Sequence, residues 1–156
     1  MSTVFFDTWA YVALANPQDA GHPAAVAASE WIEENGWIAV TSDYVLDEAL
    51  TGLHAAAGAR PAMAFLDDLE AEVAAGQLVL LSIDSGRRAQ ALRCFRRLAP
   101  DTPRLSFTDC TSFALLEELK IRAAFTPDRH FSKVKGVHRM IQLVQDRLVF
   151  RAPVSY

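Results

Sequence analysis

The chain has 156 residues, 51% hydrophobic and 22% charged, which suffices to bury one substantial core but is short for two domains. We therefore expect a single domain over residues 1–156. Apolar runs are too short to cross a bilayer, and Cys94 and Cys110 lack the spacing of a zinc site or a disulfide scaffold. No basic segment precedes an apolar one near the start, so we expect a cytoplasmic protein without a membrane anchor.

The net charge of −4 hides an uneven distribution along the chain. Residues 1–86 have one basic and 13 acidic side chains, a net charge of −12. Residues 87–156 have 14 basic and six acidic side chains, a net charge of +8. Solvated helix faces are the ordinary interpretation. However, a polyanion responds to the local basic patch, so the acidic total does not exclude an RNA or DNA partner.

Short apolar runs alternate with longer segments of helical periodicity. This alternation is typical of successive βα units, so we predict an α/β fold with a mostly parallel central sheet. Possible helix N-caps are Ser42, Asp84 and Thr108. After Asp128 the pattern allows a loop or short helix, followed by a strand or a helix. The expected strands cover residues 3–6, 37–41, 78–82 and 121–126. The expected helices cover residues 8–15, 22–35, 43–57, 61–75, 86–98 and 108–120.

Four acidic residues fall where a parallel sheet gathers its ligands, near the carboxyl ends of the strands. Asp7 directly follows the first predicted strand, and Asp128 lies two residues beyond the fourth. Asp109 lies in the first turn of the helix that leads into that fourth strand. Glu48 lies on one flank of the apolar face of the helix after the second strand, beside the small Gly52.

Each acid also has an ordinary structural role open to it. Asp7 and Asp109 are suited to helix N-termini, and Asp128 to a turn. Together, however, converging carboxylates raise one another's pKa unless a cation neutralises them. Oxygen ligands without cysteine or clustered histidine suit Mg²⁺ or Mn²⁺. The histidines show no metal-ligand spacing and are assigned no catalytic role: His22, His54, His130 and His138.

The segments VFFDTWAYVAL, TSDYVLDEAL, LSFTDCTSFALLEEL and IRAAFTPDRHF, in this order, resemble PIN-domain ribonucleases, and most closely the VapC-type toxins of toxin–antitoxin pairs. The resemblance implies a three-layer α/β/α sandwich that cleaves RNA endonucleolytically with water activated by Mg²⁺ or Mn²⁺. It also implies a homodimer inhibited by a cognate antitoxin. By this resemblance, Asp7 and Asp109 are direct metal ligands. Glu48 and Asp128 act directly or through water.

Other polar residues are candidates for supporting roles. Thr108 and Ser112 resemble hydroxyls that flank the third acid of the family, although a helix cap and a helix-surface serine account for them equally well. On the helix at 86–98, Arg93, Arg96 and Arg97 share one arc and are candidates for RNA-backbone contacts, with a solvated face as the alternative. An unpaired base could stack on an exposed aromatic ring, which the sequence does not identify.

Two other functions are compatible with parts of the pattern. VFFDT also resembles the nucleophile strand of haloacid-dehalogenase-like phosphatases, but Trp9 stands where that family has a second aspartate. A PIN-like domain that binds RNA or a partner without catalysis is the other alternative. Against it stands the presence of all four acids, because an idle cluster of like charges is unfavourable without a metal.

Overall fold

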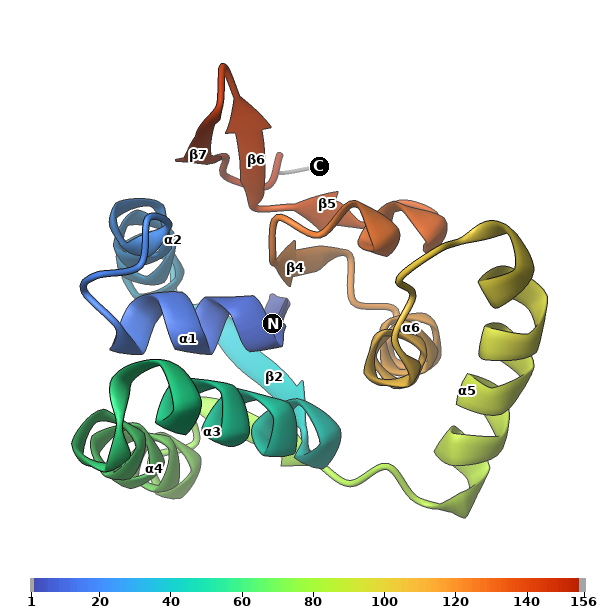
Figure 1. Cartoon of the computed structure of the whole chain (residues 1–156), viewed down its shortest axis with the longest axis horizontal. Helices are drawn as coiled ribbons and strands as arrows, with labels where there is room; N and C mark the ends of the chain where they lie inside the picture. Colours follow the sequence, from blue (N-terminus) through green and yellow to red (C-terminus); the bar gives the residue numbers. More distant parts are fainter. Residues whose placement is uncertain (1, 155–156) are drawn as a thin grey trace.

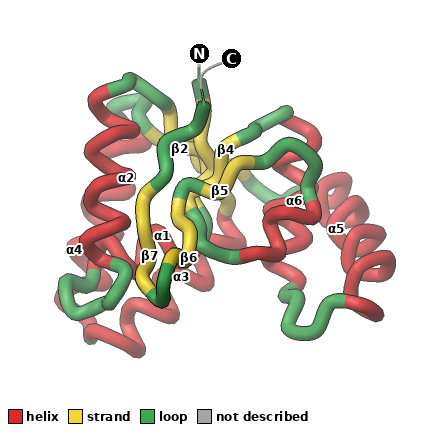
Figure 2. The backbone as a smooth tube through the Cα atoms, turned by 90° about the horizontal axis from the view of Figure 1, so that it is seen from above, coloured by secondary structure: helices red, strands yellow, loops and turns green. Residues whose placement is uncertain are grey.

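The computed structural model describes residues 2–154 and has a five-stranded parallel sheet at its centre, in the order β3-β2-β1-β4-β5. Helices α1 to α4 pack together on one side of the strands, and α5 and α6 lie on the other (Figure 1, Figure 2). This arrangement confirms the predicted three-layer α/β/α fold.

The sheet strands are β1 (Thr3–Phe6), β2 (Ile38–Ser42), β3 (Leu78–Leu81), β4 (Ala123–Phe125) and β5 (His138–Arg139). The helices are α1 (Thr8–Ala15), α2 (His22–Glu34), α3 (Asp43–Ala57), α4 (Ala59–Ala74), α5 (Ser85–Leu98) and α6 (Phe107–Leu119). All four predicted strands and all six predicted helices are present, with boundaries shifted by two residues or fewer. Among the described residues, no helix has both the length and the apolar character needed to span a membrane.

Local sequence signals explain where most helices begin and end. The hydroxyl of Ser42 accepts a hydrogen bond from Val45 N at 3.2 Å and caps α3, which ends at Gly58 with φ +90°, a conformation that favours glycine. The carboxylate of Asp84 accepts from Arg87 N at 2.9 Å and caps α5. Both residues were predicted as caps.

The predicted cap of α6 was wrong. The helix begins at Phe107, and Ser106, not Thr108, is its N-cap. The Ser106 hydroxyl accepts from Asp109 N at 2.9 Å, and the Asp109 carboxylate accepts from Ser106 N at 3.2 Å. This reciprocal capping box satisfies two backbone donors that a cap at Thr108 would leave unpaired. It also fixes the position of the Asp109 side chain.

The segment after Asp128 contains elements that the sequence left open. A short 3-10 helix, η2 (Arg129–Lys133), leads into β5, and β6 (Ile141–Val144) pairs with β7 (Arg147–Phe150) in an antiparallel hairpin. The hairpin turns at Gln145 and Asp146, both with positive φ, as a two-residue type I′ turn requires. A strand, not a helix, therefore follows η2.

Buried aromatic rings attach η2 to the rest of the core. Phe131 is fully buried, with its ring centroid 5.1 Å from that of Phe113 in α6 and 6.3 Å from that of Phe5 in β1. Burying such a side chain contributes about 1.5–3 kcal/mol. This packing holds the segment that follows β4 against β1 and the middle of α6.

Candidate metal centre

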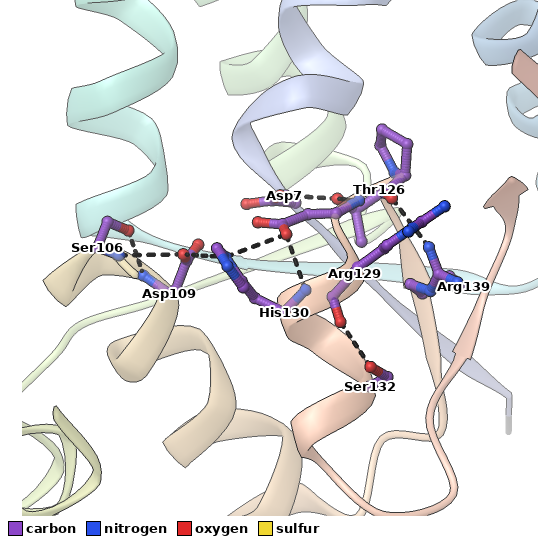
Figure 3. Close-up of polar contacts among 10 residues, drawn as sticks. Asp7, Ser106, Asp109, Thr126, Arg129, His130, Ser132 and Arg139 are labelled. Carbon is purple, nitrogen blue, oxygen red and sulfur yellow. Dashed lines mark hydrogen bonds and ion pairs between the residues drawn. The ribbon is translucent and has the colours of Figure 1, made fainter. Parts of the chain in front are cut away.

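Asp7 occupies the N-cap position of α1 but does not act as a side-chain cap. It follows the buried strand β1, is 7% exposed, and makes no side-chain cap hydrogen bond. Its Oδ2 instead accepts a hydrogen bond from Thr126 Oγ1 at 2.9 Å, at the end of β4 (Figure 3). The carboxylate therefore faces the neighbouring strand end, where β1 and β4 run parallel.

Burial makes the ionised form of Asp7 costly. It raises the pKa from 3.8 to about 7, opposed in part by hydrogen bonds from Thr126 and the backbone of Thr8. The negative charges of Asp109 and Asp128 raise the pKa further. A carboxylate in such surroundings is stabilised in its ionised form by a nearby cation.

Asp109 and Asp128 approach the same place from α6 and from the end of β4. Asp109, almost buried, has a pKa raised by burial, a shift that Ser106 opposes and Asp128 increases. Asp128 is held by its own turn: its backbone N donates to Thr126 Oγ1 at 3.1 Å, and its Oδ1 accepts from His130 N at 2.8 Å. Thr126 thus contacts both Asp7 and Asp128.

His130 lies between two of these acids, although the sequence assigned it no role. Its Nδ1 is 3.2 Å from Asp128 Oδ1 and 3.5 Å from Asp109 Oδ2 (Figure 3). One ligand atom from each of the three residues lies within 4.8 Å of the others. The Nδ1 atom is buried and has no hydrogen-bond partner among the described residues.

These features fit a divalent cation. Two carboxylates and an imidazole with an unpaired nitrogen offer ligands that suit Mn²⁺, and the oxygen atoms alone suit Mg²⁺. A cation here would neutralise the charges of Asp7, Asp109 and Asp128, which repel one another. The predicted convergence of acids at the carboxyl end of the sheet is therefore present for three of the four residues.

The fourth acid, Glu48, lies exposed on α3 and is not part of the close ligand set. Its role remains a prediction. Ser112, one turn after Asp109, is fully buried, and its hydroxyl has no partner among the described residues, so the alternative of a helix-surface serine was wrong. Thr108 is half-buried, and its carbonyl accepts a hydrogen bond from the Thr111 hydroxyl at 2.6 Å.

The three candidate RNA-contacting arginines lie exposed on α5: Arg93, Arg96 and Arg97. Within residues 2–154, none of them forms an ion pair with an acidic side chain. Arg93 Nε donates to Gln90 on the same helix at 3.3 Å. Their charges are therefore available to an anionic ligand, as a phosphate contact requires.

Sequence reasoning missed the residues that support the acids. Thr126 bridges Asp7 and Asp128, and Arg139 Nη1 donates to the Pro127 carbonyl at 2.9 Å, which holds the same turn (Figure 3). A signal for His130 existed in the spacing of TPDRH, since an Asx-type turn at Asp128 brings the residue two positions on back toward it. No local signal distinguished Arg139.

Comparison with known proteins supports this interpretation. The sequence matches the PIN domain family over residues 4–137. The structure is similar to the VapC20 toxin of Mycobacterium tuberculosis, which cleaves the sarcin-ricin loop, with 28% identity, a TM-score of 0.71, and coverage of 85% of this chain and 95% of that one.

The structure is also similar to VapBC2 of Rickettsia felis bound to a DNA fragment from its promoter, with 12% identity, a TM-score of 0.62, and coverage of 86% and 95%. At that identity the likeness shows the fold alone. No match was found among curated proteins. The acids at the strand ends, the α/β/α sandwich and the family match over most of the sequence agree, and the chain belongs to the PIN domain family as a VapC-like nuclease.

Proposed function

We propose that the chain is a Mg²⁺- or Mn²⁺-dependent endoribonuclease and the toxin of a VapBC-type pair, acting in the cytoplasm. The observation that supports this proposal most strongly is the burial of Asp7 near the charges of Asp109 and Asp128, with His130 Nδ1 between the last two. A hydrolytic metal site needs such a cluster of fixed, poorly solvated ligands.

The residues of the site have different roles, which depend on their positions. Asp7 and Asp109 would hold the cation directly, and Asp128 and His130 would hold it directly or through water. A bound Mg²⁺ or Mn²⁺ lowers the pKa of water and neutralises charge that develops on the phosphodiester. Thr126 fixes the Asp7 carboxylate through its hydroxyl, and the capping box fixes Asp109. Such support keeps the ligands in one arrangement throughout the reaction.

The remaining proposed partners are the RNA backbone, which the basic helix α5 would contact, and other protein chains. Arg93, Arg96 and Arg97 would contact the RNA backbone from α5. We propose a cognate antitoxin as the protein partner and a homodimer as the assembly of the free toxin. Membership of the PIN family speaks against the haloacid-dehalogenase-like alternative.

A catalytically idle PIN-like domain is distinguished by cleavage assays. We expect the purified chain to cleave RNA in the presence of Mg²⁺ or Mn²⁺ and not in excess EDTA. The cleavage rate of Asp7→Asn should be more than about 100-fold lower than that of the wild type, since even residues that contact a metal's ligands contribute about 10- to 100-fold. Circular dichroism checks that the variant is folded. Metal-independent cleavage, or full activity in Asp7→Asn, contradicts the proposal.

Adjacent residues on α3 test the role of Glu48 in the same assay. Glu48 and Asp47 are both exposed acids on this helix, which makes one a matched control for the other. We expect Glu48→Gln to lower the cleavage rate by about 10- to 100-fold and Asp47→Asn to leave it unchanged. Equal effects of the two substitutions would remove Glu48 from the site.

A further inference from the structure

Three aromatic rings form a row beside the candidate metal centre. The ring centroids of Tyr44 in α3 and Phe107 in α6 are 6.1 Å apart, and those of Phe107 and Phe95 in α5 are 6.4 Å apart. Both pairs meet edge to face, at 67° and 78°. Phe107 directly follows Ser106, which is hydrogen-bonded to Asp109. The row therefore adjoins the first turn that carries a candidate metal ligand.

The outer end of this row is open to solvent. Phe95 is 37% exposed, and Leu92, one turn earlier on α5, is 55% exposed. Tyr44 and Phe107 are half-buried and pack against the core. An edge-to-face contact orients a ring at little conformational cost. Phe95 is thus an exposed ring whose position is supported by Phe107.

The charges around Phe95 favour a polyanionic ligand. Helix α5 contains no acidic residue and has five arginines: Arg87, Arg88, Arg93, Arg96 and Arg97. Arg87 is paired with Glu118 at 2.9 Å, whereas Arg96 and also Arg88, which lies two helical turns before Phe95 on the same face of α5, are exposed. A second copy docked through the same face would bring these arginines together, which like-charge repulsion opposes. An RNA backbone would be attracted.

We infer that Phe95 is a stacking platform for an unpaired base of the RNA substrate, supported by Phe107, with Arg88 and Arg96 contacting the adjacent phosphates. The inference rests on the proposed function and adds the surface of α5 on which a base of the substrate is held. Every base has a π-face that can stack on an aromatic ring, but in a duplex those faces are covered by neighbouring bases.

Binding assays test this inference without depending on cleavage. The probe is a short mixed-sequence single-stranded oligoribonucleotide containing a fluorescent adenine analogue, titrated with protein in an Asp7→Asn background. We expect wild-type Phe95 to quench the analogue. Phe95→Leu should weaken single-strand binding by about 5- to 100-fold and abolish the quenching, while duplex RNA binding stays the same. Unchanged single-strand binding and quenching in Phe95→Leu would overturn the inference.

Matched variants separate base stacking on Phe95 from a general apolar contact and from a dimer interface. Phe95→Trp should retain binding because it keeps a π-face, and Leu119→Ala, an exposed apolar residue at the other end of α6, should have no effect. Light scattering shows whether Phe95→Leu changes the oligomeric state. Dissociation of a dimer with unaltered RNA binding would identify the face as an interface between copies and refute the inference. If Phe95→Leu loses single-strand binding but the wild-type chain does not cleave RNA, the stacking role of Phe95 stands and only the proposed nuclease function is refuted.

Discussion

Carboxylates gather at two places in this molecule, with different consequences. Asp109 is buried beside Asp128 and His130, and Asp7 is buried at the end of β1, within reach of the charges of Asp109 and Asp128. A hollow of about 600 Å³ lies between α1, α2 and α4, and its walls include aromatic rings. Three exposed acids also line it: Glu33, Asp68 and Glu72. Both clusters consist of like charges brought together by the fold.

The two clusters differ in how water reaches them. At the second cluster, partial burial and the charges of Asp68 and Glu33 raise the pKa of Glu72, but solvent still surrounds all three side chains. At the first, burial dominates the raised pKa of Asp7, and an unpaired imidazole nitrogen faces two of the acids. Like charge alone therefore does not indicate a metal site, whereas poorly solvated ligands aimed at one point do.

The first expected difference between the clusters is in metal binding. Mg²⁺ or Mn²⁺ at about 100 times its dissociation constant should stabilise the wild-type chain by about 2.7 kcal/mol, because it binds the folded state. We expect Asp109→Asn to abolish this stabilisation and Asp68→Asn to retain it. Thermal unfolding with and without metal measures the effect. Equal loss in both variants would place the metal elsewhere or make the binding non-specific.

His130 is the second distinguishing feature, since the exposed cluster has no comparable nitrogen ligand. We expect His130→Ala to lower metal affinity by about 10- to 100-fold while leaving the fold intact. The matched control is His54→Ala, an exposed histidine on α3. Isothermal titration with Mn²⁺ measures the affinities. Unchanged affinity in His130→Ala would restrict the ligand set to the carboxylates.

The clusters should also differ in the pH dependence of stability without metal. Asp7 has a pKa of about 7 when folded and an ordinary value of 3.8. Between these values the folded state retains a proton that the unfolded chain has released. The contribution of Asp7 to the free energy of unfolding therefore falls as pH rises, by up to about 1.4 kcal/mol per pH unit, and is constant above the folded pKa.

Denaturant unfolding in EDTA at several pH values between about 4 and 7 measures this slope. Asp7→Asn cannot titrate at this position and should lose the fall in stability. Glu72→Gln should alter the slope less, because that side chain is largely solvated. Identical pH profiles for wild type and Asp7→Asn would mean that Asp7 is not desolvated as the structure indicates.

The sequence was informative wherever one segment contains its own signal. The apolar run before Asp7, the periodicity of the helices and the caps at Ser42 and Asp84 depend on neighbouring residues, and all were predicted correctly. The capping box of α6 was also encoded locally, in Ser106 and Asp109, but the adjacent Thr108 offered an equally plausible cap. The hairpin of β6 and β7 lacks the glycine that usually marks such turns.

The order of strands and acids along the chain determined the fold family and three acids that meet at the edge of the sheet. Tertiary structure alone decided that Thr126 bonds to Asp7, 119 positions away, and that His130 lies between Asp109 and Asp128. It also decided that the ring of Phe95 on α5 stays exposed. The physical reason is that hydrogen bonds, desolvation and packing depend on distances between segments, which periodicity and spacing along one chain do not specify.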